Sequence, residues 1–129
     1  MAGPSRLKNP VQLRPRIKVW LETDGRYVFG FGLSEILRAV NQHSSIKQAA
    51  ASLGKSYRYI WGRLKEAERA LGQKLVETHV GGTGLQRSFL TPTARKLVKD
   101  FLGVRRRIME VADQEFRRRF GSSSRSANA

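Results

Sequence analysis

The sequence predicts an α+β fold that is mainly helical, with two small β-hairpins and a long C-terminal helix. Three observations predict it. Residues 45–71 have the pattern of two amphipathic helices joined by a tight turn at Gly54. A glycine-rich hairpin pattern follows at residues 74–90, and apolar residues at helical spacing then run from Pro92 to Phe120. Two helices, a hairpin and a closing helix in this order predict a winged helix-turn-helix.

The N-terminal part of the chain predicts an arm followed by a hairpin. Residues 1–15 contain proline, arginine and lysine but no acidic residue, which is typical of a flexible basic arm. Residues 16–31 alternate apolar and polar side chains on either side of Asp24-Gly25, a strong turn signal. One apolar face of this hairpin is expected to pack on the helices, formed by Ile17, Val19, Leu21, Tyr27, Phe29 and Phe31.

Three helices are predicted between the two hairpins. The first covers residues 33–43, with Leu33, Ile36, Leu37 and Val40 on its apolar face. Ser45 is a suitable N-cap for the second helix, and Gly54 is expected to end it in the left-handed conformation. Ser56 then caps a third helix that stops at Gly72. The apolar face of this helix is expected to comprise Tyr57, Ile60, Trp61, Leu64, Ala67 and Leu71; we favour core packing for Trp61, and the role of Tyr57 stays open.

The last helix is predicted to extend beyond the domain that precedes it. Thr91 is a suitable N-cap and Pro92 a suitable first residue. If the helix continues through Gly103 to Phe120, it is about 43 Å long at roughly 1.5 Å per residue. A small core cannot cover that length, so a homodimer is predicted. The heptad-spaced stripe supplies the expected dimerisation residues, Leu97, Phe101, Val104, Ile108 and Val111.

Length and spacing also predict the division of the chain. We expect a basic arm at residues 1–15, a winged helix-turn-helix domain at 16–91, a dimerisation helix at 92–120 and a disordered Ser-rich tail at 121–129.

Composition indicates the kind of partner. Lys and Arg number 25 against 10 Asp and Glu, which gives a formal net charge of +15. Such a charge on a small domain indicates a polyanion, most often nucleic acid, with an anionic membrane surface as the competing partner. No apolar run is long enough to cross a membrane, and residues 1–10 lack the apolar segment of a secretory signal. A cytoplasmic, nucleoid-associated protein is expected.

The sequence offers no candidate for catalysis or metal binding. Cysteine is absent, which excludes a disulfide framework and cysteine-based zinc sites. His43 and His79 lie far apart without clustered carboxylates. Residues 54–56, Gly-Lys-Ser, resemble the end of a phosphate-binding loop, but the required preceding glycine is Ala49 and a helix replaces the strand. We expect no enzyme activity, no cofactor and no metal.

Several motifs in order carry a family resemblance that spans about residues 13–101. They are Leu13-Arg14-Pro15, Trp20-Leu21-Glu22, Asp24-Gly25, Phe29-Gly30-Phe31-Gly32, Ser45-Ile46 with Ala49-Ala50, Leu53-Gly54-Lys55-Ser56-Tyr57, Trp61, Leu75-Val76-Glu77, Gly81-Gly82 and Leu90-Thr91. With this spacing the chain resembles the N-terminal DNA-binding domain of the ModE-type molybdate-responsive regulators, relatives of the LysR-type winged helix-turn-helix. In that family the domain binds DNA as a dimer.

The sequence departs from the family pattern in two places. Residues 85–88 stand in part of a longer glycine run of the wing, and Ala94 stands where the family has glycine. The molybdate-binding domains of full-length regulators would follow the last helix. The sequence ends at Ala129, so no molybdate site is expected in this chain.

The leading hypothesis is a dimeric, sequence-specific DNA-binding protein, a bacterial transcriptional regulator. Its third helix, residues 56–71, would enter the major groove, and the wing, residues 80–88, would lie on the flanking backbone or groove. Base edges would be met by Arg58, Tyr59 and Arg63, with Tyr57 beside them. Phosphates or the flanking groove would be met by Lys47, Lys55, Ser56, Thr83, Gln86 and Arg87.

Two other hypotheses remain open. A sequence-tolerant architectural DNA- or RNA-binding protein would use the arginine triplets at residues 105–107 and 117–119. A protein-interaction module would use the last helix and would have lost DNA binding, although the exposed positions predicted for Arg58 and Arg63 argue against it.

Overall fold

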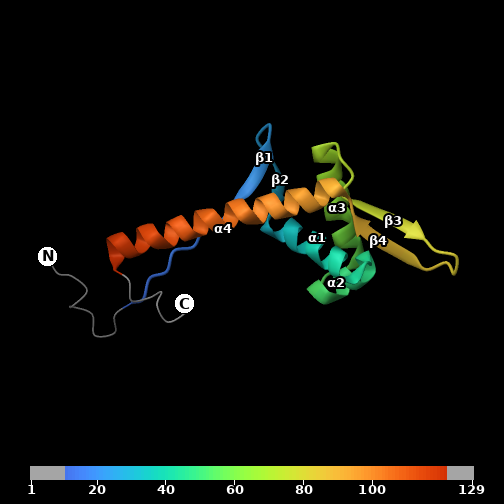
Figure 1. Cartoon of the computed structure of the whole chain (residues 1–129), viewed down its shortest axis with the longest axis horizontal. Helices are drawn as coiled ribbons and strands as arrows, with labels where there is room; N and C mark the ends of the chain where they lie inside the picture. The colour runs from blue at the N-terminus through green and yellow to red at the C-terminus, as the bar shows by residue number, and fades with distance from the viewer. Residues whose placement is uncertain (1–10, 122–129) are drawn as a thin grey trace. The chain divides into compact units, whose positions relative to one another are not determined.

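The computed structural model describes residues 11–121 and divides the chain into two compact units. One unit is Val19–Arg105, and the other comprises the described residues on either side of it. The predicted arm at 1–15 and tail at 121–129 lie largely outside the described residues. The elements, in order, are β1 (Trp20–Thr23), β2 (Arg26–Gly30), α1 (Phe31–His43), α2 (Ile46–Leu53), α3 (Tyr57–Leu71), β3 (Val76–Val80), β4 (Gln86–Leu90) and α4 (Pro92–Phe120) (Figure 1).

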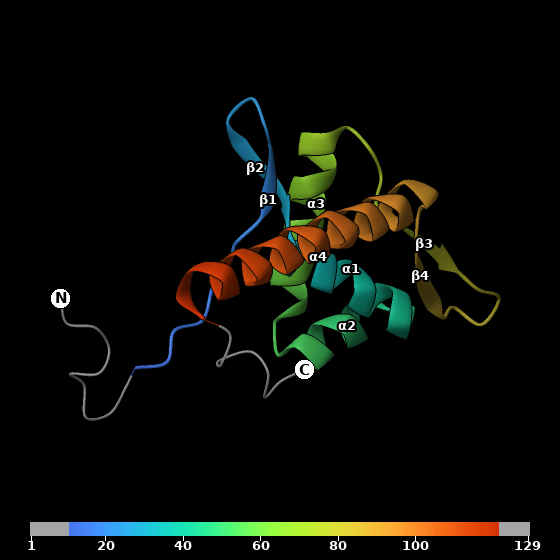
Figure 2. The same ribbon diagram turned by 60° about the vertical axis from the view of Figure 1, so that its left-hand side comes forward.

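This order is that of a winged helix-turn-helix with an N-terminal hairpin, as the sequence predicts. Strands β1 and β2 form one antiparallel pair, and β3 and β4 form a second. We call the second pair, with its loop at residues 81–85, the wing. Both views show the two hairpins on opposite sides of α3 (Figures 1 and 2).

The predicted caps of the helix-turn-helix are confirmed. The Ser45 hydroxyl accepts a hydrogen bond from the Gln48 backbone N–H at 3.0 Å, and α2 ends at Gly54 with a left-handed φ of 69°. The Ser56 hydroxyl accepts from the Tyr59 N–H, also at 3.0 Å. Each hydroxyl satisfies a backbone donor that has no partner within its helix, and this fixes where α2 and α3 begin.

The core of the unit Val19–Arg105 is built mainly from the predicted faces of α1, α2 and α3. Ala49 and Ala50 of α2 are buried, and their small side chains allow the helices to approach closely. Phe29 of β2 meets Phe101 of α4 edge to face, with ring centroids 5.2 Å apart. The largest fully buried side chains are Phe29, Leu33, Leu37, Ile60, Leu64 and Leu75.

The single apolar face predicted for the first hairpin is wrong. All of β1 is exposed, including Trp20 and Leu21, and the register shifts between Leu21 and Glu22. Burial falls instead on consecutive residues at the end of β2, where Val28 is 5% and Phe29 0% exposed. Successive side chains of a strand point to opposite faces. Both faces are covered here, because Phe29 packs on α4 and β2 also contacts α3.

The predicted N-cap of α4 is confirmed, and the helix is continuous through Gly103. The Thr91 hydroxyl accepts from the Ala94 N–H at 3.1 Å and donates to the Lys74 carbonyl oxygen at 2.8 Å. Ala94, Val98 and Phe101 are buried. The start of α4 is therefore part of the core and is positioned by Lys74, in the segment before β3.

The predicted dimerisation stripe on α4 divides into a buried part and an exposed part. Phe101 is 3% exposed, and Leu97 packs against the core of its own chain. Val104, Ile108 and Val111 are 51%, 38% and 45% exposed. The inclusion of Phe101 in a surface stripe was wrong, since the sequence could not show that Phe29 meets its ring.

We expect Phe101→Ala to lower the free energy of unfolding by about 3–5 kcal/mol, because it empties a buried aromatic site. Phe120→Ala makes the same change on the same helix at a side chain that is 66% exposed. It should cost less than about 1 kcal/mol. Urea denaturation followed by circular dichroism measures both, and equal losses would contradict the packing described.

Candidate nucleic-acid interface

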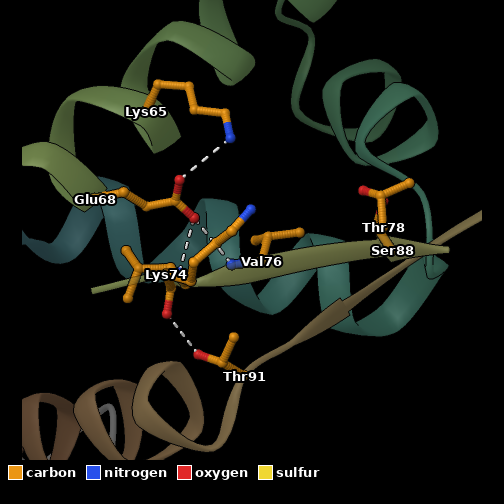
Figure 3. A network of polar contacts seen from close by, with 8 residues as sticks. Lys65, Glu68, Lys74, Val76, Thr78, Ser88 and Thr91 are labelled. Carbon is orange, nitrogen blue, oxygen red and sulfur yellow. Dashed lines mark hydrogen bonds and ion pairs between the residues drawn. The ribbon is translucent and has the colours of Figure 1, made fainter. Parts of the chain in front are cut away.

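The wing is attached to α3 through the carboxylate of Glu68. One carboxylate oxygen accepts hydrogen bonds from the backbone N–H groups of Leu75 and Val76, at 2.8 and 3.2 Å (Figure 3). The other oxygen lies 3.3 Å from the Lys65 ammonium. The Glu68 side chain is only 11% exposed. A single charged group therefore links the third helix to the start of β3.

The environment of Glu68 favours its ionised form. Desolvation opposes ionisation and is the largest single effect, but the N–H groups of Leu75 and Val76 and the Lys65 ammonium together outweigh it. The pKa of Glu68 is consequently lower than that of an ordinary glutamate. The link between α3 and the wing is thus charged at neutral pH.

Further hydrogen bonds attach the wing to other elements. The Ser88 N–H of β4 donates to the carbonyl oxygen of Ser44, in the turn between α1 and α2, at 2.9 Å. The hydroxyls of Thr78 and Ser88 are 2.9 Å apart across the hairpin. The Ser88–Ser44 bond joins the wing to the turn between α1 and α2. The bond between Thr91 and Lys74 joins the segment before β3 to the start of α4 (Figure 3).

A hollow of about 660 Å³ opens between the first turn of α2, α3 and the wing. Three ammonium-bearing side chains line it, Lys47 from α2, Lys65 from α3 and Lys74 from the segment before β3. Its only lining carboxylate is Glu68, which is already bonded to Lys65 and the wing. The walls therefore carry a net positive charge that suits an anionic group.

The flank of α3 that faces the wing carries exposed aromatic side chains. Tyr57 is 50% and Trp61 45% exposed, and both line the hollow. Our preference for core packing of Trp61 was wrong. The core accepts the narrower stripe of Ile60, Leu64 and Ala67. The Lys65 ammonium lies 5.5 Å from the centre of the Trp61 ring, within cation–π range.

The opposite flank of α3 faces the first hairpin and holds Arg63. Its guanidinium donates to the Tyr59 hydroxyl at 3.1 Å and lies 5.9 Å from the centre of the Tyr27 ring. Partial burial lowers the pKa of Arg63, but the two tyrosines outweigh that effect and raise it. Arg63 is thus already engaged with its own chain.

The side of α3 directed away from the core bears Arg58, Gly62 and Arg69, which we call the outer face. Both arginines are exposed, and neither forms an ion pair within residues 11–121. Lys55 and Ser56 precede this face at the start of α3, where the Lys55 ammonium lies 5.5 Å from the Tyr59 ring. The outer face therefore presents positive charge.

The wing loop is closed by hydrogen bonds within its backbone. The Gly81 N–H donates to the Leu85 carbonyl oxygen at 2.8 Å, and the Gly84 N–H donates to that of Gly81 at 2.9 Å. Thr83 lies in this loop, and Gln86 and Arg87 begin β4; all three are exposed.

Sequence reasoning placed Gly62 on the exposed side of α3 but missed Ser45, Lys65, Glu68 and Lys74 as parts of this surface. Lys65 follows Trp61 by one helical turn, so the spacing could have placed it beside that ring. The contact of Glu68 with residues seven and eight positions later gives no local signal.

In the part of the chain that the structure describes, no group of three or more His, Asp or Glu residues could hold a metal ion. No helix within residues 11–121 combines the length and apolarity needed to span a bilayer.

Comparison with known proteins gives two similarities. Residues 32–95 match the family described as bacterial regulatory helix-turn-helix protein, lysR family. The chain is also 36% identical over 80 residues to the molybdenum transport protein ModE of Herbaspirillum seropedicae. That alignment covers 62% of this chain and 30% of the relative. The chain therefore corresponds to less than a third of the relative's length.

The Glu68 link predicts a pH-dependent difference in stability between the wild type and Glu68→Gln. The folded pKa is lowered, so the advantage of the carboxylate is fully present above about pH 4.3, the ordinary glutamate pKa. It is lost as the pH falls through the lower folded value. At neutral pH we expect the free energy of unfolding of Glu68→Gln to be roughly 1–2 kcal/mol lower than that of the wild type. Urea denaturation at a series of pH values measures this difference. Glu66→Gln, at an exposed position of the same helix, is the control. A stability difference between the wild type and Glu68→Gln that stays the same or grows in acid would contradict the link.

Proposed function

Because residues 32–95 form a helix-turn-helix domain of the LysR type, similar to that of ModE, we propose that this chain is a transcriptional regulator that binds duplex DNA sequence-specifically as a homodimer. The observation that carries the proposal is the attachment of the wing to α3 through Glu68. It brings cations of α2, α3 and the wing region around one hollow.

A duplex fits this surface in one general orientation. Helix α3 lies in the major groove, and the wing reaches the adjoining minor groove. The sugar-phosphate strand that separates these two grooves then has to pass between α3 and the wing. The hollow lies there, and Lys47, Lys65 and Lys74 line it, which supports a phosphate-binding role for these three side chains.

The residues of α3 take different roles in this orientation. Arg58 is exposed at the start of the outer face, where it can donate to guanine in the major groove. Tyr59 and Tyr57 lie beside it on the two flanks. Arg63, which we expected to meet a base, is bonded to Tyr59 and stacked on Tyr27, so we reassign it to holding the first hairpin against α3.

Contacts outside α3 supply affinity more than sequence discrimination. Lys55 and Ser56 at the start of α3 are assigned to phosphates. Thr83, Gln86 and Arg87 of the wing are assigned to phosphates or the minor-groove edge. Each contact that neutralises a phosphate adds salt dependence.

For dimerisation we retain Val104, Ile108 and Val111, with Leu97 at the margin, and remove Phe101. The three exposed residues recur at spacings of four and three along α4, so they share one face of the helix. Pairing two copies of this face would cover apolar surface that is otherwise exposed to water. It would also present two α3 helices to two half-sites.

The arginine triplets at residues 105–107 and 117–119 give little support to the alternative function, a sequence-tolerant nucleic-acid-binding protein. Arg105 stacks on Phe31 at 4.1 Å, and Arg107 lies 3.4 Å from Glu110. Arg118 and Arg119 both pair with Glu115. Four of the six arginines thus already have partners in their own chain.

Duplex binding is expected to weaken steeply with salt. The three lysines around the hollow in each protomer predict, for the bound dimer, a slope of about −5.4 or steeper in a log–log plot, at roughly −0.9 per neutralised phosphate. Fluorescence anisotropy of a labelled duplex across a salt series measures the slope. Lys47→Ala with Lys74→Ala removes four contacts from the dimer and should reduce the slope by about 3.6, while Lys99→Ala, at an exposed lysine outside the hollow, should not change it. A slope near zero would remove DNA as the partner.

Light scattering is expected to give twice the chain mass of 14.6 kDa at micromolar concentration and moderate salt. Ile108→Asp combined with Val111→Asp should give the single-chain mass, because it places charges in the proposed contact. Arg106→Asp adds an acid on the other side of α4 and should stay dimeric. A double variant that remains dimeric would show that another surface holds the pair.

A further inference from the structure

Gly62 is a glycine that the fold itself does not require. It lies in the interior of α3, and its φ is not among the positive values found in the described chain. A Cβ atom built on Gly62 meets nothing within 4 Å. Gly30 is the contrast, because a Cβ there would come within 2.6 Å of the Tyr27 hydroxyl. Packing explains Gly30 but not Gly62.

A glycine in a helix interior lowers stability relative to alanine, since it leaves the unfolded chain more conformational freedom. Alanine at position 62 would remove that cost without a clash in the free protein. A glycine with this cost and no internal purpose suggests that something outside the chain approaches the backbone closely.

The position of Gly62 indicates which kind of partner approaches the backbone there. It lies on the outer face of α3, between Arg58 one turn before it and Arg69 two turns after it. Ile60, Leu64 and Ala67 occupy the buried face. Neither arginine of the outer face forms an ion pair in the described chain. Exposed Glu66 lies one turn after Gly62, but the two arginines outnumber it, so the bare backbone lies within a surface whose net charge suits a polyanion.

We propose that Gly62 is the point where the backbone of α3 lies in van der Waals contact with the base-pair edges of the DNA major groove. A helix with its side chains is about 10–12 Å across, and the major groove is about 12 Å wide. Such a helix enters more deeply where its leading side has no side chain. The deeper position carries Arg58 to the base edges. This inference rests on the proposed function and adds to it the residue that determines how deeply α3 enters the major groove.

The consequence is an opposite effect of one methyl group on folding and on binding. Gly62→Ala should raise the melting temperature, by about 4–8 °C. The same methyl group should weaken binding to a selected operator duplex by about tenfold, the effect of one forced methyl in a close-packed interface. If Gly62 did not contact DNA, the same substitution would raise the melting temperature and leave operator binding unchanged.

The test compares three variants with the wild type, by calorimetry and by anisotropy on an operator selected from random duplexes. Gly62→Leu should weaken binding more than Gly62→Ala, because its side chain is larger. Gly32→Ala is the matched control: Gly32 is an exposed glycine of α1 whose Cβ would also meet nothing within 4 Å. It should leave operator affinity unchanged.

The outcomes separate this inference from the proposed function. If wild-type protein binds the operator and Gly62→Ala binds equally well, the close approach is wrong and the regulator assignment stands. If Gly32→Ala weakens binding as much as Gly62→Ala, the effect is not local and the inference also fails. If wild-type protein selects and binds no duplex, the proposed function itself is wrong and the inference falls with it.

Discussion

The bond between the Glu68 carboxylate and the backbone of Leu75 and Val76 determines what the rest of the surface can do. A two-stranded ribbon has little core of its own, and its direction depends on where its ends are held. Glu68 holds one end against α3, while Thr91 bonds to Lys74, in the segment before β3, and caps α4. The helix and the wing can therefore meet one rigid partner together.

Several features of this surface are unfavourable for the stability of the free protein. Trp61 and Tyr57 are about half exposed, three lysines surround one hollow, and a glycine interrupts an otherwise favourable helix. Apart from the contact of Lys65 with Glu68, none of these features improves the isolated fold, and the net charge of +15 adds repulsion. Each becomes favourable beside a polyanion that neutralises the lysines and covers the aromatic rings. Local departures from good packing thus coincide with the proposed interface.

Local chemistry made most of the fold predictable. Ser45, Gly54 and Ser56 act through neighbours within a few residues, so the sequence alone places the ends of α2 and α3. The failures involve contacts between distant residues. Phe101 followed the heptad pattern but packs on Phe29, 72 positions earlier, and the half-exposed Trp61 followed the helical pattern. The role of Glu68 had no pattern to reveal it, because backbone N–H groups are its partners.

Hydroxyl-radical footprinting of a selected operator tests the central claim, that Glu68 makes α3 and the wing act on one duplex. For the wild type we expect a continuous block of protected sugars on one strand, from the edge of the major groove into the adjoining minor groove. In Glu68→Ala the block should shrink to the part that α3 covers, because the wing is no longer held in place. Identical footprints for the two proteins would contradict the claim.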